Sequence, residues 1–168
     1  MIILWKAPKG FKNRKAGRMI FLPIFAIMHR EPRMQTTTRL ALNLLRLAGI
    51  VQIVLGLLFW TGNAIGLIQI HMTVGFVLVI AIWVLALLGL AARGDVPTKL
   101  VILAIIWGAI VPVLGLNQAR LLPGDFHWVI KVVHLLVGLI AIGLGEEIAK
   151  RILAHGARAR LLSEGFNA

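Results

Sequence analysis

The chain has 168 residues, of which 60% are hydrophobic and 14% are charged, and it carries a formal net charge of +12. A water-soluble domain of this length does not need so much apolar surface, so the composition favours a membrane protein. Cysteine is absent, which excludes disulfides, iron–sulfur clusters and the covalent attachment of c-type haem.

Residues 1–38 form a basic segment that contains an apolar patch at residues 19–28. The patch is too short to cross a membrane and contains Pro23, so we expect this cytoplasmic segment to lie in the membrane interface. The segment lacks the long apolar region and the cleavage site of a secretory signal. Met34 is an alternative start, which leaves open whether residues 1–33 are expressed.

Four apolar runs that follow each have the length of a transmembrane helix. Short breaks with the glycine, proline, asparagine and aspartate of turns separate them, so consecutive helices should be antiparallel neighbours. We predict an all-α membrane protein in which residues 39–150 form an up-down bundle of four transmembrane helices and residues 151–168 form a basic cytoplasmic tail. The predicted helices are residues 40–60, 65–92, 96–117 and 126–148, with Pro112 inside the third.

The distribution of lysine and arginine predicts the orientation. Of the 18 basic residues, only Arg120 and Lys131 lie toward the outer side; the others lie before or early in the first helix, in the second break or in the tail. By the positive-inside rule both termini are cytoplasmic, and we expect an integral protein of a bacterial inner membrane. A cationic surface next to an anionic lipid leaflet accounts for the net charge without nucleic acid.

Two histidines lie inside apolar helices, and each is followed by a glycine one turn later: His71 with Gly75, and His134 with Gly138. Helices two and four run in the same direction, and the histidines lie roughly 9 Å and 12 Å along them from the outer end, at about 1.5 Å per residue. We expect these helices to be diagonal partners, with axes about 11–14 Å apart when neighbours are about 8–10 Å apart. Because iron–nitrogen bonds are roughly 2 Å long, this gap suits one flat macrocycle with two axial histidines.

The surroundings of the two histidines fit the same interpretation. A glycine four residues on lies on the same helix face, where it would let a porphyrin edge approach the backbone, although helix packing also favours glycine in membranes. Lys131 lies one turn before His134 and can pair with a haem propionate, or it can snorkel to the headgroups. Arg120 in the outer loop is a second candidate for the propionate. The other histidines are expected to be solvated or interfacial, and they are His29, His127 and His155.

An internal repeat relates the two histidines. The tripeptide VLG at residues 54–56, late in the first helix, recurs at residues 113–115, late in the third. In each half, a polar break and a helix with H-x-x-x-G follow. This order predicts two duplicated hairpins related by an axis along the membrane normal, with His71 and His134 facing one central site. No second histidine pair occurs at the inner depth, so we expect one bis-histidine haem per chain.

With these motifs the sequence resembles small four-helix b-type membrane cytochromes and related uncharacterised four-helix membrane proteins with Q-x-x-x-G and H-x-x-x-G motifs. The resemblance covers residues 40–150 and implies haem b between His71 and His134 and a role in electron transfer. The larger di-haem cytochromes carry four histidines, two per leaflet, whereas this chain has only the outer pair. The residues that match the motifs are Gln52 with Gly56, His71 with Gly75, and His134 with Gly138.

We therefore expect a b-type cytochrome in the lipid bilayer, with one bis-histidine haem near the outer face. Such ligation leaves iron no open position, which favours an electron-transfer protein over a stand-alone enzyme. We expect its partner to be a quinone or an outer-side redox protein. The alternative is a non-redox accessory or scaffold subunit of a larger membrane complex or homo-oligomer, in which the histidines are polar contacts between helices. Motifs of soluble enzymes, such as a Walker loop, G-x-S-x-G or H-E-x-x-H, are absent.

Overall fold

The computed structural model describes residues 14–92, 94 and 96–165. Part of the predicted basic segment, residues 1–13, and Arg93 of the second break lie outside the described residues. The chain divides into two compact units, Met1–Arg33 and Met34–Ala168. The described part of the first unit, residues 14–33, is helical and contains the apolar patch that we expected in the membrane interface. The second unit contains every residue of the histidine and glycine motifs.

Four long helices account for almost all of the described residues, and each contains a segment that is long and apolar enough to cross a membrane. The prediction of an all-α protein with four transmembrane helices is thereby confirmed. The elements are α1 (Arg14–Trp60), η1 (Ile65–Leu67), α2 (Ile68–Ala91), α3 (Thr98–Asn117), η2 (Gln118–Arg120) and α4 (His127–Gly165), where η1 and η2 are single 3₁₀ turns.

Helix α4 is longer than the apolar run that predicted it. We expected an end near residue 148, but the helix continues to Gly165, just as α1 begins well before residue 40. A helix requires backbone hydrogen bonds rather than apolar side chains, and residues 149–165 are rich in good helix formers such as alanine, leucine and arginine. Packing on α1 supports the extension, because Ile152 is only 1% exposed and Gly156 lies against the buried side chain of Gln35.

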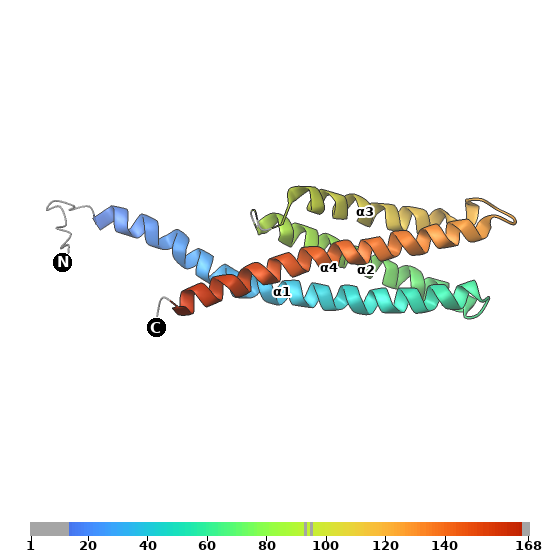
Figure 1. The fold of residues 1–168 in the computed structure, drawn as a ribbon, viewed down its shortest axis with the longest axis horizontal. Helices are drawn as coiled ribbons and strands as arrows, with labels where there is room; N and C mark the ends of the chain where they lie inside the picture. The colour runs from blue at the N-terminus through green and yellow to red at the C-terminus, as the bar shows by residue number, and fades with distance from the viewer. Residues whose placement is uncertain (1–13, 93, 95, 166–168) are drawn as a thin grey trace. The chain divides into compact units, whose positions relative to one another are not determined.

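Both helical hairpins turn at the same end of the bundle, which we call the hairpin end (Figure 1). The connections there are residues 61–64 and 121–126, and the connection between α2 and α3 lies at the opposite end. Gly62 and Gly124 have φ angles of 79° and 90°, which glycine adopts without steric strain. Consecutive helices therefore run antiparallel, as the short breaks predicted.

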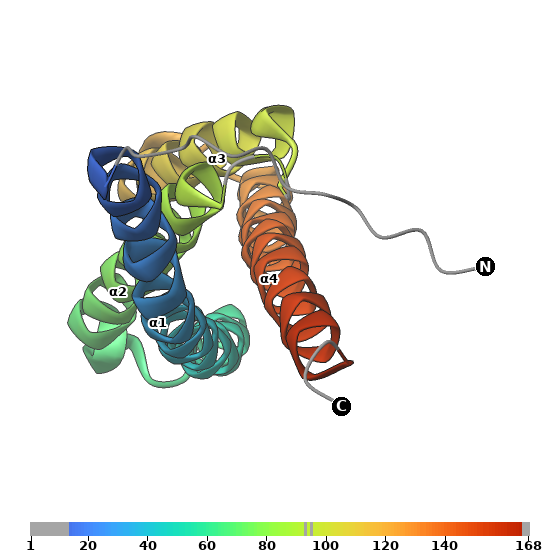
Figure 2. The same cartoon turned by 90° about the vertical axis from the view of Figure 1, so that its left-hand side faces the viewer.

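Helices α2 and α4 are in direct contact, and α3 packs against both of them. Figures 1 and 2 show α1 and α3 on opposite sides of the α2–α4 pair. Glycine allows the close approach, since a Cβ at Gly89 of α2 would lie 3.2 Å from side-chain atoms of both Ile148 of α4 and Val101 of α3. The two helices are thus closer than the diagonal separation of about 11–14 Å that we expected, because small residues let their backbones approach.

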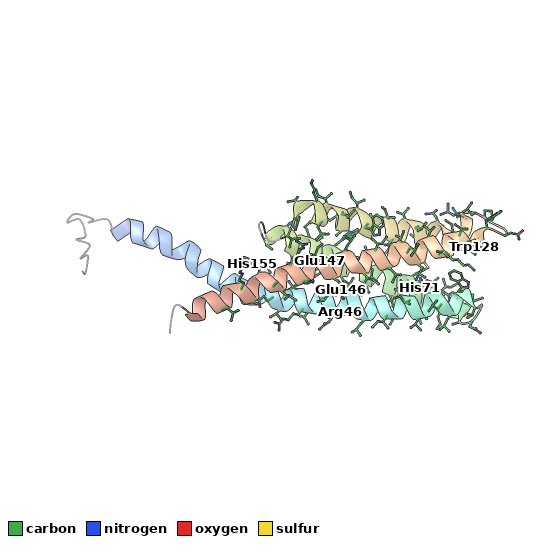
Figure 3. The ribbon with its side chains drawn as sticks, in the orientation of Figure 1. Arg46, His71, Trp128, Glu146, Glu147 and His155 are labelled. Carbon is green, nitrogen blue, oxygen red and sulfur yellow. The ribbon has the colours of Figure 1, made fainter. Side chains whose placement is uncertain are left out.

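Helix α1 is joined to α4 by a packing contact and by a neighbouring ion pair. Leu45 is fully buried, and a Cβ at Gly145 would lie 2.5 Å from it and 3.5 Å from Leu85 of α2. The next residue, Arg46, faces Glu146 across the same interface (Figure 3) and donates two hydrogen bonds to its carboxylate, at 2.6 and 2.8 Å. A bidentate pair of this kind satisfies both charges within apolar segments.

Candidate functional site

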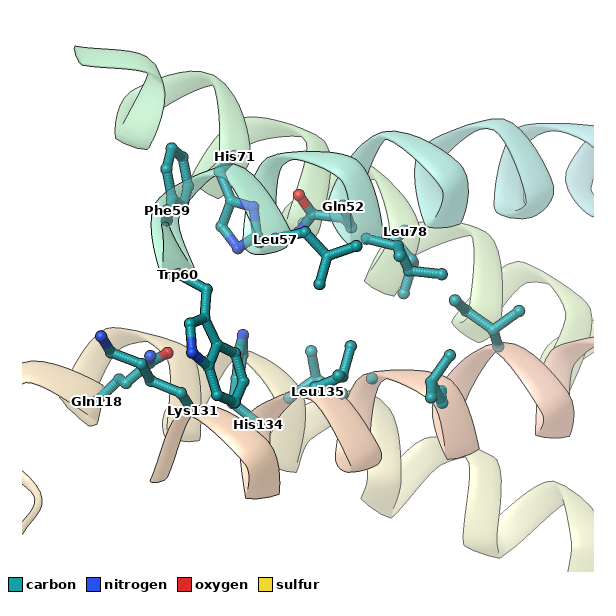
Figure 4. A pocket seen from close by; sticks show the side chains of 17 residues that line it. Gln52, Leu57, Phe59, Trp60, His71, Leu78, Gln118, Lys131, His134 and Leu135 are labelled. Carbon is teal, nitrogen blue, oxygen red and sulfur yellow. The ribbon is translucent and has the colours of Figure 1, made fainter. Parts of the chain in front are cut away.

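His71 of α2 lies near the hairpin end (Figure 3), and it points toward His134 of α4 across a cavity (Figure 4). Their ring centroids are 6.4 Å apart and their ring planes are inclined by 56°. Both side chains are half-buried, and Phe59 of α1 packs edge-on against His71 with a centroid separation of 5.2 Å. The structure therefore brings together the two histidines that the sequence paired, one from the second helix of each hairpin.

A cavity with two lobes adjoins the histidine pair. The α1/α4 lobe, lined mainly by those two helices, has a volume of about 140 Å³ (Figure 4), and the α2/α3 lobe has a volume of about 480 Å³. The larger volume lies within the range of small-molecule sites, about 300–1,000 Å³. Because the two lobes share much of their lining, the cavity extends to both sides of the histidines. The shared residues are Gln52, Phe59, His71, Gly75, Val111, Gln118 and His134.

Gly75 and Gly138 line the cavity together with the histidines that precede them. Their surroundings differ. A Cβ at Gly75 would lie 2.6 Å from Nε2 of Gln52, whereas a Cβ at Gly138 would have no neighbouring heavy atom of the described structure within 4 Å. Gly75 therefore makes room for a side chain of α1, and Gly138 leaves open space at the cavity wall. Helix packing does not explain a glycine at residue 138.

A third glycine, Gly115 of α3, supports the position of His134. A Cβ at Gly115 would lie 3.1 Å from Cε1 of that ring, so a larger residue would push the ring. We did not predict Gly115 as a site residue, although the signal was present in the repeated tripeptide VLG. The corresponding glycine of the first repeat, Gly56, also lines the cavity.

The two predicted propionate partners lie in different places. Lys131 lines the α1/α4 lobe, close to Trp60 and Gln118 (Figure 4). Arg120 is exposed in η2 and lines neither lobe. We did not predict Trp60 and Gln118 as site residues, since a tryptophan at a helix end is equally typical of an aromatic belt at the membrane–water interface. An amide in a polar break is equally typical of a turn.

A third histidine, His127, also borders the cavity. We expected this side chain to be solvated or interfacial; it is partly exposed at the start of α4 and also lines the α2/α3 lobe. Its Nδ1 lies 3.3 Å from the carbonyl oxygen of Leu121, in the connection that precedes α4. His127 does not join His71 and His134 in a group of three metal-binding side chains among the described residues.

Three buried polar atoms at the cavity have no hydrogen-bond partner among the described residues. They are Oε1 of Gln52 and Nδ1 of both His71 and His134. Buried polar atoms in folded proteins are almost always paired, so three orphans around one cavity require an explanation. One explanation is a bound group that would pair with these atoms. Such a group suits an apolar site with a few convergent polar groups.

The donor set fits a metal ion only if a bound organic group supplies most of its ligands. Zinc sites take three or four protein ligands, and no three His, Cys, Asp or Glu side chains of the described residues come together. Haem supplies the four nitrogens of its ring and leaves two axial positions for the protein. With iron–nitrogen bonds of about 2 Å, two axial imidazoles have ring centres about 6 Å apart. The observed separation is 6.4 Å.

The fold and the site define an integral membrane protein with four helices and a two-histidine cavity near the hairpin end. The chain matches no protein-family model, no curated protein and no solved structure. The resemblance to b-type membrane cytochromes therefore stays a prediction, and the function is inferred from the cavity itself.

Proposed function

We propose that the chain is a membrane b-type cytochrome that holds one haem between His71 and His134 and transfers electrons. The observation that carries the proposal is the pair of rings that face each other at 6.4 Å, with open space on both sides. This spacing is too long for a hydrogen bond between the rings and suits two axial ligands of one metal ion.

Each part of the cavity wall has a role in this proposal. His71 and His134 provide one nitrogen lone pair each, and Gly138 leaves room for the edge of the macrocycle. The apolar lining, with Leu135 and Leu139 of α4, excludes water and lowers the local dielectric. A bound haem would supply one-electron chemistry, and ligation by both His71 and His134 would leave no open position on its iron. Electron transfer therefore fits this site better than oxygen binding.

The proposed haem lies toward the outer face of a bacterial inner membrane. Lys131 and Arg120 are the basic residues at the hairpin end, and the remaining lysines and arginines favour the cytoplasmic side by the positive-inside rule. Both termini are then cytoplasmic. A quinone in the bilayer or an outer-side redox protein can exchange electrons at this depth.

Lys131→Met should keep the haem and lower its midpoint potential, because loss of a nearby positive charge favours the more positive, oxidised iron. We expect a shift on the order of tens of millivolts, where about 59 mV corresponds to a tenfold change for one electron. A redox titration of the detergent-purified protein measures it. Lys131→Arg keeps the charge, and Lys150→Met changes an exposed residue of α4 far from the site, so both should retain the wild-type potential. An unchanged potential in Lys131→Met would exclude the propionate role.

A visible spectrum of the purified protein, oxidised and then reduced with dithionite, tests the proposal directly. Sharp reduced α and β bands and a haem content near one per chain are the expected result. A colourless protein, expressed with adequate haem supply, would contradict it. In that case the histidines would be polar contacts between helices, and a non-redox accessory or scaffold subunit of a larger complex would be the better interpretation.

A further inference from the structure

Two of the three unpartnered buried atoms have complementary chemistry. Oε1 of Gln52 can only accept a hydrogen bond, and Nδ1 of His71 can donate one when the neutral imidazole carries its proton there. A proton on Nδ1 leaves the lone pair on Nε2, the nitrogen farther from the backbone. One hydrogen bond between the two side chains would therefore satisfy both buried atoms and select the tautomer of His71.

The packing of α1 on α2 places these side chains on the same wall of the cavity. Gln52 of α1 lies against the backbone of Gly75, where a Cβ would be 2.6 Å from its Nε2. Gly75 is one helical turn from His71, and both residues line both lobes with Gln52. Figure 4 shows Gln52 and His71 on one side of the cavity and His134 on the other. The amide is thus seated beside His71 because residue 75 has no side chain.

The repeat places an apolar residue at the corresponding position of the second half. Aligning residues 54–56 with residues 113–115 places Val111 of α3 at the position of Gln52. Val111 also lines both lobes, but its side chain offers no acceptor. Each half of the cavity therefore carries a histidine and a glycine, and the two halves differ in the residue at this position.

We propose that Gln52 is a positioning residue for His71, whose Nδ1–H donates a hydrogen bond to the Gln52 side-chain oxygen. The inference rests on the proposed function, since it assigns Nε2 of His71 to the metal. Such a hydrogen bond fixes the ring orientation and makes the imidazole a stronger donor. The stronger donor stabilises the oxidised iron and lowers the midpoint potential. His71 and His134 are then unequal ligands of one haem.

Gln52→Leu tests this role, because leucine has a similar size and no acceptor. The variant should keep a low-spin haem, and its midpoint potential should rise by an amount equivalent to about a tenfold change in the reduction equilibrium, or about 59 mV. Gln52→Glu keeps an acceptor oxygen and adds negative charge, so its potential should be no higher than that of the wild type. Asn43→Leu removes an exposed amide of the same helix away from the cavity and should leave the potential unchanged.

An unchanged potential in Gln52→Leu, or an equal rise in Asn43→Leu, would overturn the role of Gln52 while leaving the haem assignment in place. A higher potential in Gln52→Glu would overturn it as well, and this variant carries the test if the leucine variant does not fold. A wild-type protein without haem would instead refute the proposed function, so the two failures are distinguishable.

Discussion

Replacing either His71 or His134 with alanine should abolish the low-spin reduced spectrum. The two rings face each other across the cavity, and loss of one would leave iron with a single protein ligand. We expect haem content to fall by roughly 10–100-fold in each variant, the range of losses that follow removal of even an outer-shell partner. Visible spectra and haem extraction of both purified variants provide the measurement.

The matched control is His155→Ala, which removes an exposed histidine of α4 outside the cavity. This variant should retain the wild-type spectrum. If both His71→Ala and His134→Ala kept the low-spin bands, neither histidine would be an axial ligand. Loss of the bands in only one of them would show that the chain uses a different second ligand.

Gly138→Phe should yield a folded protein that lacks haem. Because a Cβ at this residue meets no neighbouring heavy atom within 4 Å in the described structure, the new ring can enter the α1/α4 lobe without displacing a helix. A phenyl ring there would occupy much of a space of about 140 Å³. We expect haem content to fall about tenfold or more while the thermal unfolding midpoint in detergent changes little, since overpacking penalties of about 1–3 kcal/mol apply only where a core is already filled.

Gly143→Phe is the control for this substitution. Gly143 lies on the same helix, also has open space at its Cβ position, and does not line the cavity. Full haem content in both variants would show that the α1/α4 lobe is not part of the cofactor site. If Gly138→Phe unfolded while Gly143→Phe stayed folded, Gly138 would instead be required for helix packing.

The helices and their number follow from the sequence for a simple physical reason. In lipid each backbone polar group must be satisfied within the segment, so an apolar run of sufficient length is restricted to a helix. Short breaks then impose antiparallel neighbours, and the parallel direction of the second and fourth helices places His71 and His134 at comparable depth. The pairing of the two histidines and the position of Lys131 near them could be predicted on this basis.

Other features of the site depend on contacts between residues that are distant in the chain. The direct contact of α2 with α4 arises where Gly89 meets Ile148 and Val101, and no local pattern specifies which helices approach so closely. The same holds for Gln52, whose amide lies near His71 only because Gly75 gives it space. Arg120 precedes the fourth helix in the same break as Gln118, yet Gln118 lines the cavity and Arg120 does not.

The sequence by itself determined that this protein has four apolar helices, a basic side and a repeated histidine–glycine motif, because hydrophobicity, charge and helical spacing are local properties. Only the tertiary structure decided that the rings stand 6.4 Å apart, that Gly138 borders open space and that the amide of Gln52 lies on the same side of the cavity as His71. These are consequences of side-chain volume at helix contacts, where one absent methyl group determines whether a neighbouring side chain or a ligand can enter.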